Sequence, residues 1–111
     1  MDAKQMRSLV ESQIGDAWDT TNHHGVDLQK ALVAPKRITV IERLVQNGQS
    51  KDRLLDVWLV LVEIAESNKG YRVVATEDGR MFGLASEGFP ADRYPVLCGW
   101  YGDFMTTFEA M

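Results

Sequence analysis

Residues 54–65, with the sequence LLDVWLVLVEIA, decide the fold of this chain. Only Asp56 and Glu63 are charged, so a helix here would need burial on every side, which a domain of 111 residues can hardly provide. A central β-strand needs cover on only two faces, and we therefore predict a strand. Counted by twos, its apolar side chains divide between two faces: Val57, Leu59 and Leu61 on one, and Trp58, Val60, Val62 and Ile64 on the other.

The preceding segment is predicted to pair with this strand. The run ITVI at 38–41 is rich in β-branched residues, although the apolar spacing from Ile38 to Val45 also fits a helix, so both assignments stay open for residues 38–64. In the strand assignment, the polar stretch 46–52 connects two antiparallel strands.

A second hairpin is predicted between residues 71 and 86, around the dipeptide Asp78-Gly79. This dipeptide fits a two-residue type I′ turn. The turn would place Glu77 opposite Arg80 and would fix the cross-strand pairs Ala75–Phe82 and Val73–Leu84.

Helices are predicted at both ends of the chain. Asp2 and Gln5 form a capping box before an apolar helical pattern over residues 3–18, and Asp103 can cap a closing helix. A short helical turn is expected behind Asp27, and a last strand over residues 95–100. The predicted architecture is a single α+β domain over residues 1–111, with a four- or five-stranded antiparallel sheet and the N-terminal and C-terminal helices packed on it.

Composition restricts the class of protein. The chain is 25% charged with a formal net charge of −4, and its longest apolar run, residues 57–62, is far too short to cross a bilayer. No signal peptide is visible, and Cys98 is the single cysteine, so we expect a cytoplasmic protein that does not act at a membrane. Residues 30–53 carry a modest surplus of basic side chains but no aromatic residue, and nucleic-acid binding is not predicted.

His23, His24 and Asp27 form the only cluster that could bind a metal ion or act as a general base. No third ligand follows at a recognised metal spacing, so we predict no catalytic residue, no metal and no cofactor. The alternative interpretation of the histidines is a solvent-facing turn. Cys98, flanked by apolar residues, is expected in the core.

Aromatic side chains suggest further contact sites. Phe89 lies in a polar loop and could anchor a partner or cover the sheet. Trp100 and Tyr101, between two glycines, could line a pocket shared with Trp18 and Phe104, although core packing of the C-terminal helix is the favoured interpretation.

The sequence leaves two candidate functions. The central strand is apolar on both sides while the predicted helices cover one face, so we expect a protein-interaction or regulatory module whose second face is covered by another copy or by a different protein, most simply as a homodimer. The alternative is a small enzyme or small-molecule-binding protein that uses a cleft near His23, His24 and the C-terminal aromatic segment.

Overall fold

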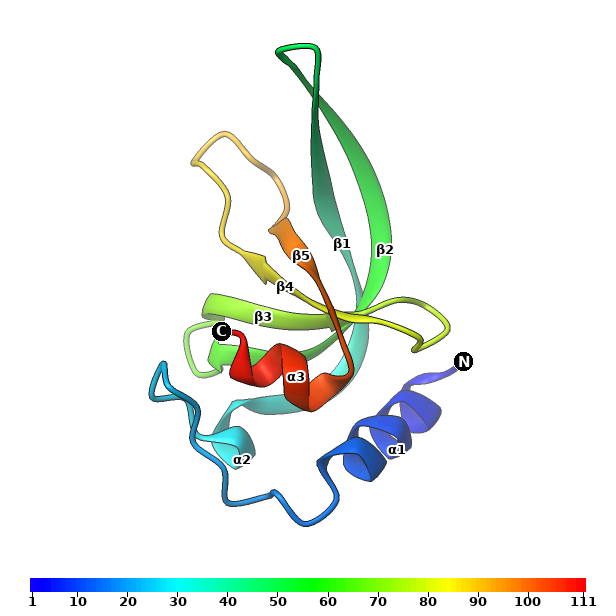
Figure 1. Cartoon of the computed structure of the whole chain (residues 1–111), viewed down its shortest axis with the longest axis vertical. Coiled ribbons are helices and arrows are strands. Elements are labelled where there is room, and N and C mark those ends of the chain that lie inside the picture. The colour runs from blue at the N-terminus through cyan, green and yellow to red at the C-terminus, as the bar shows by residue number, and fades with distance from the viewer.

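A computed structural model describes all residues from 1 to 111 and shows five strands that close into a small barrel, with three helices against it (Figure 1). The strands follow one another around the barrel in chain order. The elements are α1 (Ala3–Ile14), α2 (Leu28–Ala31), β1 (Leu32–Gln46), β2 (Gln49–Ile64), β3 (Lys69–Ala75), β4 (Phe82–Ser86), β5 (Val96–Gly102) and α3 (Phe104–Glu109).

The predicted α+β class and terminal helices are confirmed, but the prediction that the sheet is antiparallel throughout is wrong. Consecutive strands pair antiparallel, whereas β1 and β5 meet in parallel at the single pair Ile41–Val96. The backbone N–H of Ile41 donates to the carbonyl of Pro95 at 2.8 Å beside this pair. The barrel closes through this contact between two segments far apart in the sequence. Local sequence patterns therefore could not predict that the sheet closes.

The hairpin of β1 and β2 confirms the strand assignment and corrects the connection. Gln46 pairs with Gln49, so the turn is the dipeptide Asn47-Gly48 rather than the stretch 46–52. Both turn residues have positive φ, 51° and 75°, as a type I′ turn requires. Asn-Gly is the strongest sequence signal for this turn, so the turn at Asn47-Gly48 could have been predicted from the sequence.

The hairpin of β3 and β4 has the predicted register, with Ala75 opposite Phe82 and Val73 opposite Leu84. The predicted type I′ turn is wrong, because Gly79 has positive φ and Asp78 does not. The loop instead closes through a bond from the N–H of Gly79 to the carbonyl of Thr76, at 2.9 Å. The longer loop separates Glu77 from Arg80, and Glu77 pairs with Arg37 at 3.4 Å.

The helices begin where the sequence predicts. The capping box of Asp2 and Gln5 is present, and α1 stops at Ile14 rather than at residue 18 because Gly15 takes a positive φ of 56°. Asp27 and Asp103 accept backbone N–H groups at the starts of α2 and α3.

Two apolar clusters lie on opposite faces of the strands. The larger cluster packs α1 and α3 against the outer face of β2, β3 and β4. The smaller cluster receives side chains from all five strands and fills the barrel interior, for example Val40, Val74 and Ala85. The predicted assignment of the β2 side chains to two faces is correct as far as Val60. After Val60 the two faces exchange: Leu61 packs in the larger cluster and Val62 in the smaller one. A register shift between Leu59 and Leu61 causes the inversion.

This arrangement overturns the argument for an uncovered sheet face. Residues 57–62 are at most 5% exposed, because the barrel interior covers one face and the chain's own helices cover the other. Any surface for a partner must therefore lie elsewhere. None of the three helices combines the length and the apolar character that crossing a bilayer requires.

Candidate functional site

The outer part of the β1–β2 hairpin projects from the barrel, and we call residues 42–56 the arm (Figure 1). The pairing of β1 with β5 is at Ile41, and the pairing of β2 with β3 begins at Trp58. Beyond these two residues the strands pair only with each other. The arm is thus a two-stranded ribbon without the cover that the barrel gives to its base.

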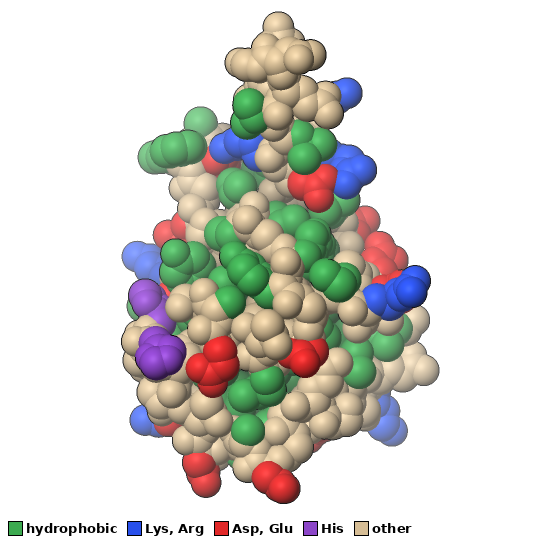
Figure 2. Space-filling view, in the orientation of Figure 1, with side chains coloured by type: hydrophobic (Ala, Val, Ile, Leu, Met, Phe, Trp, Pro, Cys, Tyr) green, Lys and Arg blue, Asp and Glu red, His purple; other side chains and the backbone are tan.

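The arm exposes apolar side chains. Val45 is 73% exposed and Leu54 is 58% exposed, and hydrophobic side chains reach the surface of this end of the molecule in Figure 2. Leu54 pairs with Ile41, so it lies on the face of β1 that also carries Arg43 and Val45. Phe89, in the loop 87–95 beside the arm, is 75% exposed.

Arg43 joins the loop to the arm. Its Nε donates to Asp52 Oδ1 at 2.9 Å and its Nη2 to Asp92 Oδ1 at 2.8 Å. The other carboxylate oxygen of Asp92 accepts the backbone N–H of Phe89, also at 2.8 Å. We call the surface formed by Val45, Leu54 and Phe89, with this ion triad between them, the arm patch.

The electrostatics of the triad follow from these bonds. The hydrogen bonds from Arg43 hold the pKa of Asp52 and the pKa of Asp92 below the ordinary carboxyl value, and the backbone N–H of Phe89 lowers the pKa of Asp92 further. The same two carboxylates raise the pKa of Arg43. All three groups are therefore charged at neutral pH, and the loop stays attached to the arm.

The other arginines of the basic stretch are also paired. Arg53 forms an ion pair with Glu42, and Arg37 pairs with Glu77 and lies over the ring of Trp58 at 5.1 Å. Carboxylates of the same chain therefore pair with all three arginines of this stretch, whereas its three lysines form no ion pair.

Of the predicted histidine cluster, His24 and Asp27 line a groove of about 360 Å³ at the other end of the barrel, and His23 does not. His23 is exposed, and Asp27 is committed to capping α2. His24 Nε2 lies 3.2 Å from Glu63 Oε2, and its ring meets that of Tyr71 edge-on at 5.6 Å. Glu63 was missed because it lies on a distant strand. No group of three metal-ligating side chains is present.

The C-terminal aromatic residues do not share a pocket. Trp18 and Phe104 pack with the larger cluster, whereas Trp100 packs half-buried with the smaller one, on the opposite face of the sheet. Tyr101 is 41% exposed, and the groove that contains His24 and Asp27 includes neither Trp100 nor Tyr101. The expectation that Cys98 lies in the core is wrong, because Cys98 is exposed, with its thiol 3.6 Å from the hydroxyl of Ser86.

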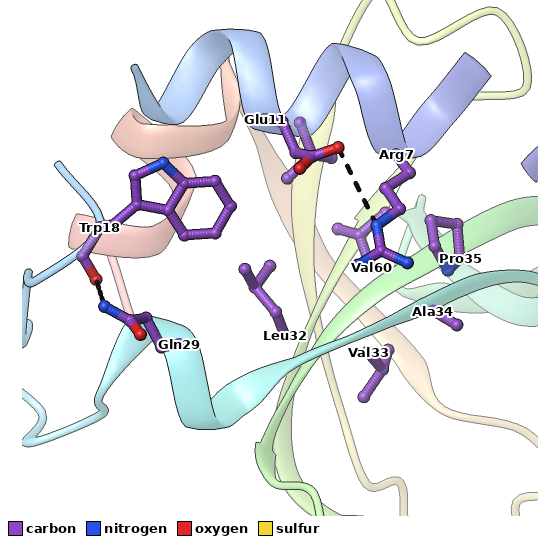
Figure 3. Close-up of a pocket in the computed structure, with 10 residues that line it drawn as sticks. Arg7, Glu11, Trp18, Gln29, Leu32, Val33, Ala34, Pro35 and Val60 are labelled. Carbon is purple, nitrogen blue, oxygen red and sulfur yellow. Dashed lines mark hydrogen bonds and ion pairs between the residues drawn. The ribbon is translucent and has the colours of Figure 1, made fainter. Parts of the chain in front are cut away.

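A pocket of about 300 Å³ lies between α1, α2 and the start of β1 (Figure 3). Pairing between β1 and β2 is interrupted here, since three residues of β1 oppose the single residue Val60. Pro35, which cannot donate a backbone hydrogen bond, lies in this interrupted stretch of β1 and is the feature of the sequence that marks it. The lining residues are Arg7, Val10, Glu11, Trp18, Gln29, Leu32, Val33, Ala34, Pro35 and Val60.

Comparisons with models of protein families, with curated proteins and with solved structures found no match. The choice among the arm patch, the histidine groove and the pocket therefore depends on their geometry. The arm patch combines exposed apolar side chains with an ordered ion triad, which is a composition suited to protein binding.

Proposed function

We propose that this protein is an interaction module that forms a homodimer through the arm patch. One observation supports this proposal above the others: the three most exposed large hydrophobic side chains of the chain, Phe89, Val45 and Leu54, all belong to the patch. Single exposed hydrophobic residues are ordinary on protein surfaces, but a group of them at one projecting end is typical of an interaction site.

The patch is ordered before any partner binds. Arg43 bridges Asp52 of the arm and Asp92 of the loop, and Asp92 holds the backbone N–H of Phe89. Fixing Phe89 in advance lowers the conformational entropy that binding would otherwise remove. An exposed aromatic side chain on an ordered loop is the kind of residue that dominates the binding energy of protein interfaces.

The charge of the arm favours a second copy as the partner. The arm carries three cations, Arg43, Lys51 and Arg53, and three anions, Glu42, Asp52 and Asp56, whereas the whole chain has a net charge of −4. Two acidic copies repel each other over most of their surface and least at this neutral region. A two-fold interface also needs a self-complementary surface, and a surface carrying both signs of charge meets that need.

We propose that the copies pack face to face rather than by pairing strand edges. The free edge of β2 carries the charged residues Lys51, Asp52, Arg53 and Asp56. Charged side chains along an edge strand discourage the addition of another strand. The apolar side chains of Val45 and Leu54 project from one face of the ribbon, where a second copy could cover them.

Light scattering coupled to gel filtration, over a concentration series, tests the proposal. We expect the wild type to move from monomer to dimer with concentration, and Phe89→Ser and the double variant Val45→Ser/Leu54→Ser to remain monomeric. Ile64→Ser is the matched control, because Ile64 is 48% exposed but lies outside the arm. A wild type that stays monomeric at every concentration, or a dimer that survives Phe89→Ser, would contradict the proposal.

A further inference from the structure

We propose that the pocket between α1, α2 and the bulge of β1 binds a small aromatic carboxylic acid. Helices α1 and α2, whose side chains line the pocket, lie at the end of the molecule opposite the arm (Figure 1), so this proposal stands apart from self-association.

The bulge creates the space. Leu32 pairs with Leu61 and Lys36 pairs with Leu59, so residues 33–35 bow away from the single residue Val60. Pro35 suits this place, because its missing N–H would be a defect in a regular ladder. Bulges of this kind redirect side chains and are frequent beside binding sites.

The walls are mainly apolar. Figure 3 shows Trp18 and Arg7 on opposite sides of the pocket, with Leu32 and Val60 between them. The indole of Trp18 provides a flat apolar surface on which an aromatic ring can stack. Gln29 fixes this wall, since its side-chain amide donates to the backbone carbonyl of Trp18 at 3.0 Å. The volume of about 300 Å³ is at the small end of the range for ligand pockets, so the ligand has few atoms beyond one ring system.

Arg7 is the group that selects an acid. Its Nε lies 3.9 Å from Glu11 Oε1, which is a long contact for an ion pair, and its side chain is 68% exposed. Exposed pairs of this type are weak. The terminal Nη atoms of Arg7 have no partner within the chain, so they are free to bind a carboxylate through two parallel hydrogen bonds.

Titrations of the ¹⁵N-labelled protein followed by NMR test this inference, with phenylacetate as the probe. Phenylacetamide is the neutral control ligand and phenethylamine is the cationic one, and both resemble phenylacetate in size. We expect saturable shifts of the Trp18 indole N–H and of the Val33 and Ala34 amides, with phenylacetate binding at least roughly tenfold more tightly than either analogue. Equal affinity for the acid and the amide, a preference for the amine, or no saturable shift would overturn the proposal.

A pair of arginine variants separates recognition by Arg7 from a general effect of charge. Arg7→Gln should remove the preference for phenylacetate and leave the weak binding of phenylacetamide unchanged. Arg80→Gln is the control, because Arg80 is also exposed but lies in the loop between β3 and β4. Loss of the preference in both variants, or its retention in Arg7→Gln, would contradict the assignment. Both side chains are exposed, so both variants should fold normally.

Discussion

The two halves of β2 differ sharply although they belong to one continuous strand. Residues 57–62 are buried on both faces, while residues 49–56 are exposed except for the half-buried Leu55. The inner half meets α1, β3 and the barrel interior, and the outer half meets only β1. The burial of an apolar residue on this strand is thus decided by what the rest of the chain places against it, and Leu54 stays exposed because nothing is placed against it.

The largest difference between the covered barrel and the exposed arm should appear in stability. Phe82 is fully buried and meets the ring of Phe104 edge-on at 5.8 Å, whereas Phe89 is 75% exposed. We expect Phe82→Ala to lower the free energy of unfolding by about 3–5 kcal/mol, because it removes a large buried side chain and leaves a cavity. Phe89→Ala should change this free energy by less than about 0.5 kcal/mol.

Urea unfolding at a concentration where the protein is monomeric measures both values, so that dissociation does not contribute. A strong loss of stability in Phe89→Ala would mean that the loop residue packs onto its own chain and is not available to a partner.

A smaller effect is expected from two glycines at the junction of β4 and β5. A Cβ at Gly83 would lie 2.5 Å from the carbonyl oxygen of Gly99 and 2.7 Å from the ring of Trp100, whereas a Cβ at Gly99 would make only ordinary contacts, the nearest at 3.6 Å. Gly83→Ala should therefore reduce the free energy of unfolding by about 1–3 kcal/mol through overpacking. Gly99→Ala should stay within about 0.5 kcal/mol of the wild type. If Gly83→Ala and Gly99→Ala changed the free energy of unfolding equally, in thermal or urea unfolding, the backbone around Gly83 would not be tightly packed.

The smallest effect concerns the attachment of the loop to the arm, and it depends on pH. The pKa values of Asp52 and Asp92 are lowered in the folded protein, so both carboxylates stabilise the attachment above their ordinary pKa of about 4 and lose this effect as the pH falls through the lowered values. We expect hydrogen-exchange protection factors in residues 89–92 to fall at acid pH while those of residues 57–62 persist.

Substituting the arginine tests the same attachment at neutral pH. Arg43→Gln should release the loop at pH 7, and Arg53→Gln, which removes a cation of the arm that does not contact the loop, should not. Loss of protection in both variants would indicate that net charge on the arm, rather than the bridge through Arg43, holds the loop.

The sequence predicted those parts of the fold that depend on neighbouring residues. The caps at Asp2, Asp27 and Asp103 and the pairing of Ala75 with Phe82 were all correct, because each depends on contacts within a few residues. The strand assignment of residues 54–64 was correct for a different reason: its apolar pattern demanded cover on two faces.

The remaining features depend on contacts between distant segments. Barrel closure requires Ile41 to meet Val96, and the arm patch requires Arg43 to reach Asp92. The exposure of Phe89 follows from the path of its loop, which its sequence did not specify. The pocket could have been suspected from Pro35 inside a strand, but its walls come from two helices that no local pattern brings together.

Hydrogen exchange of the wild type at low and at high protein concentration tests the central claim most directly. If the exposed arm is the surface through which two copies meet, protection at high concentration should increase in residues 42–56 and 87–95 and stay constant in α1 and α3. Protection that is independent of concentration, or that increases over the helices instead of the arm, would contradict the claim.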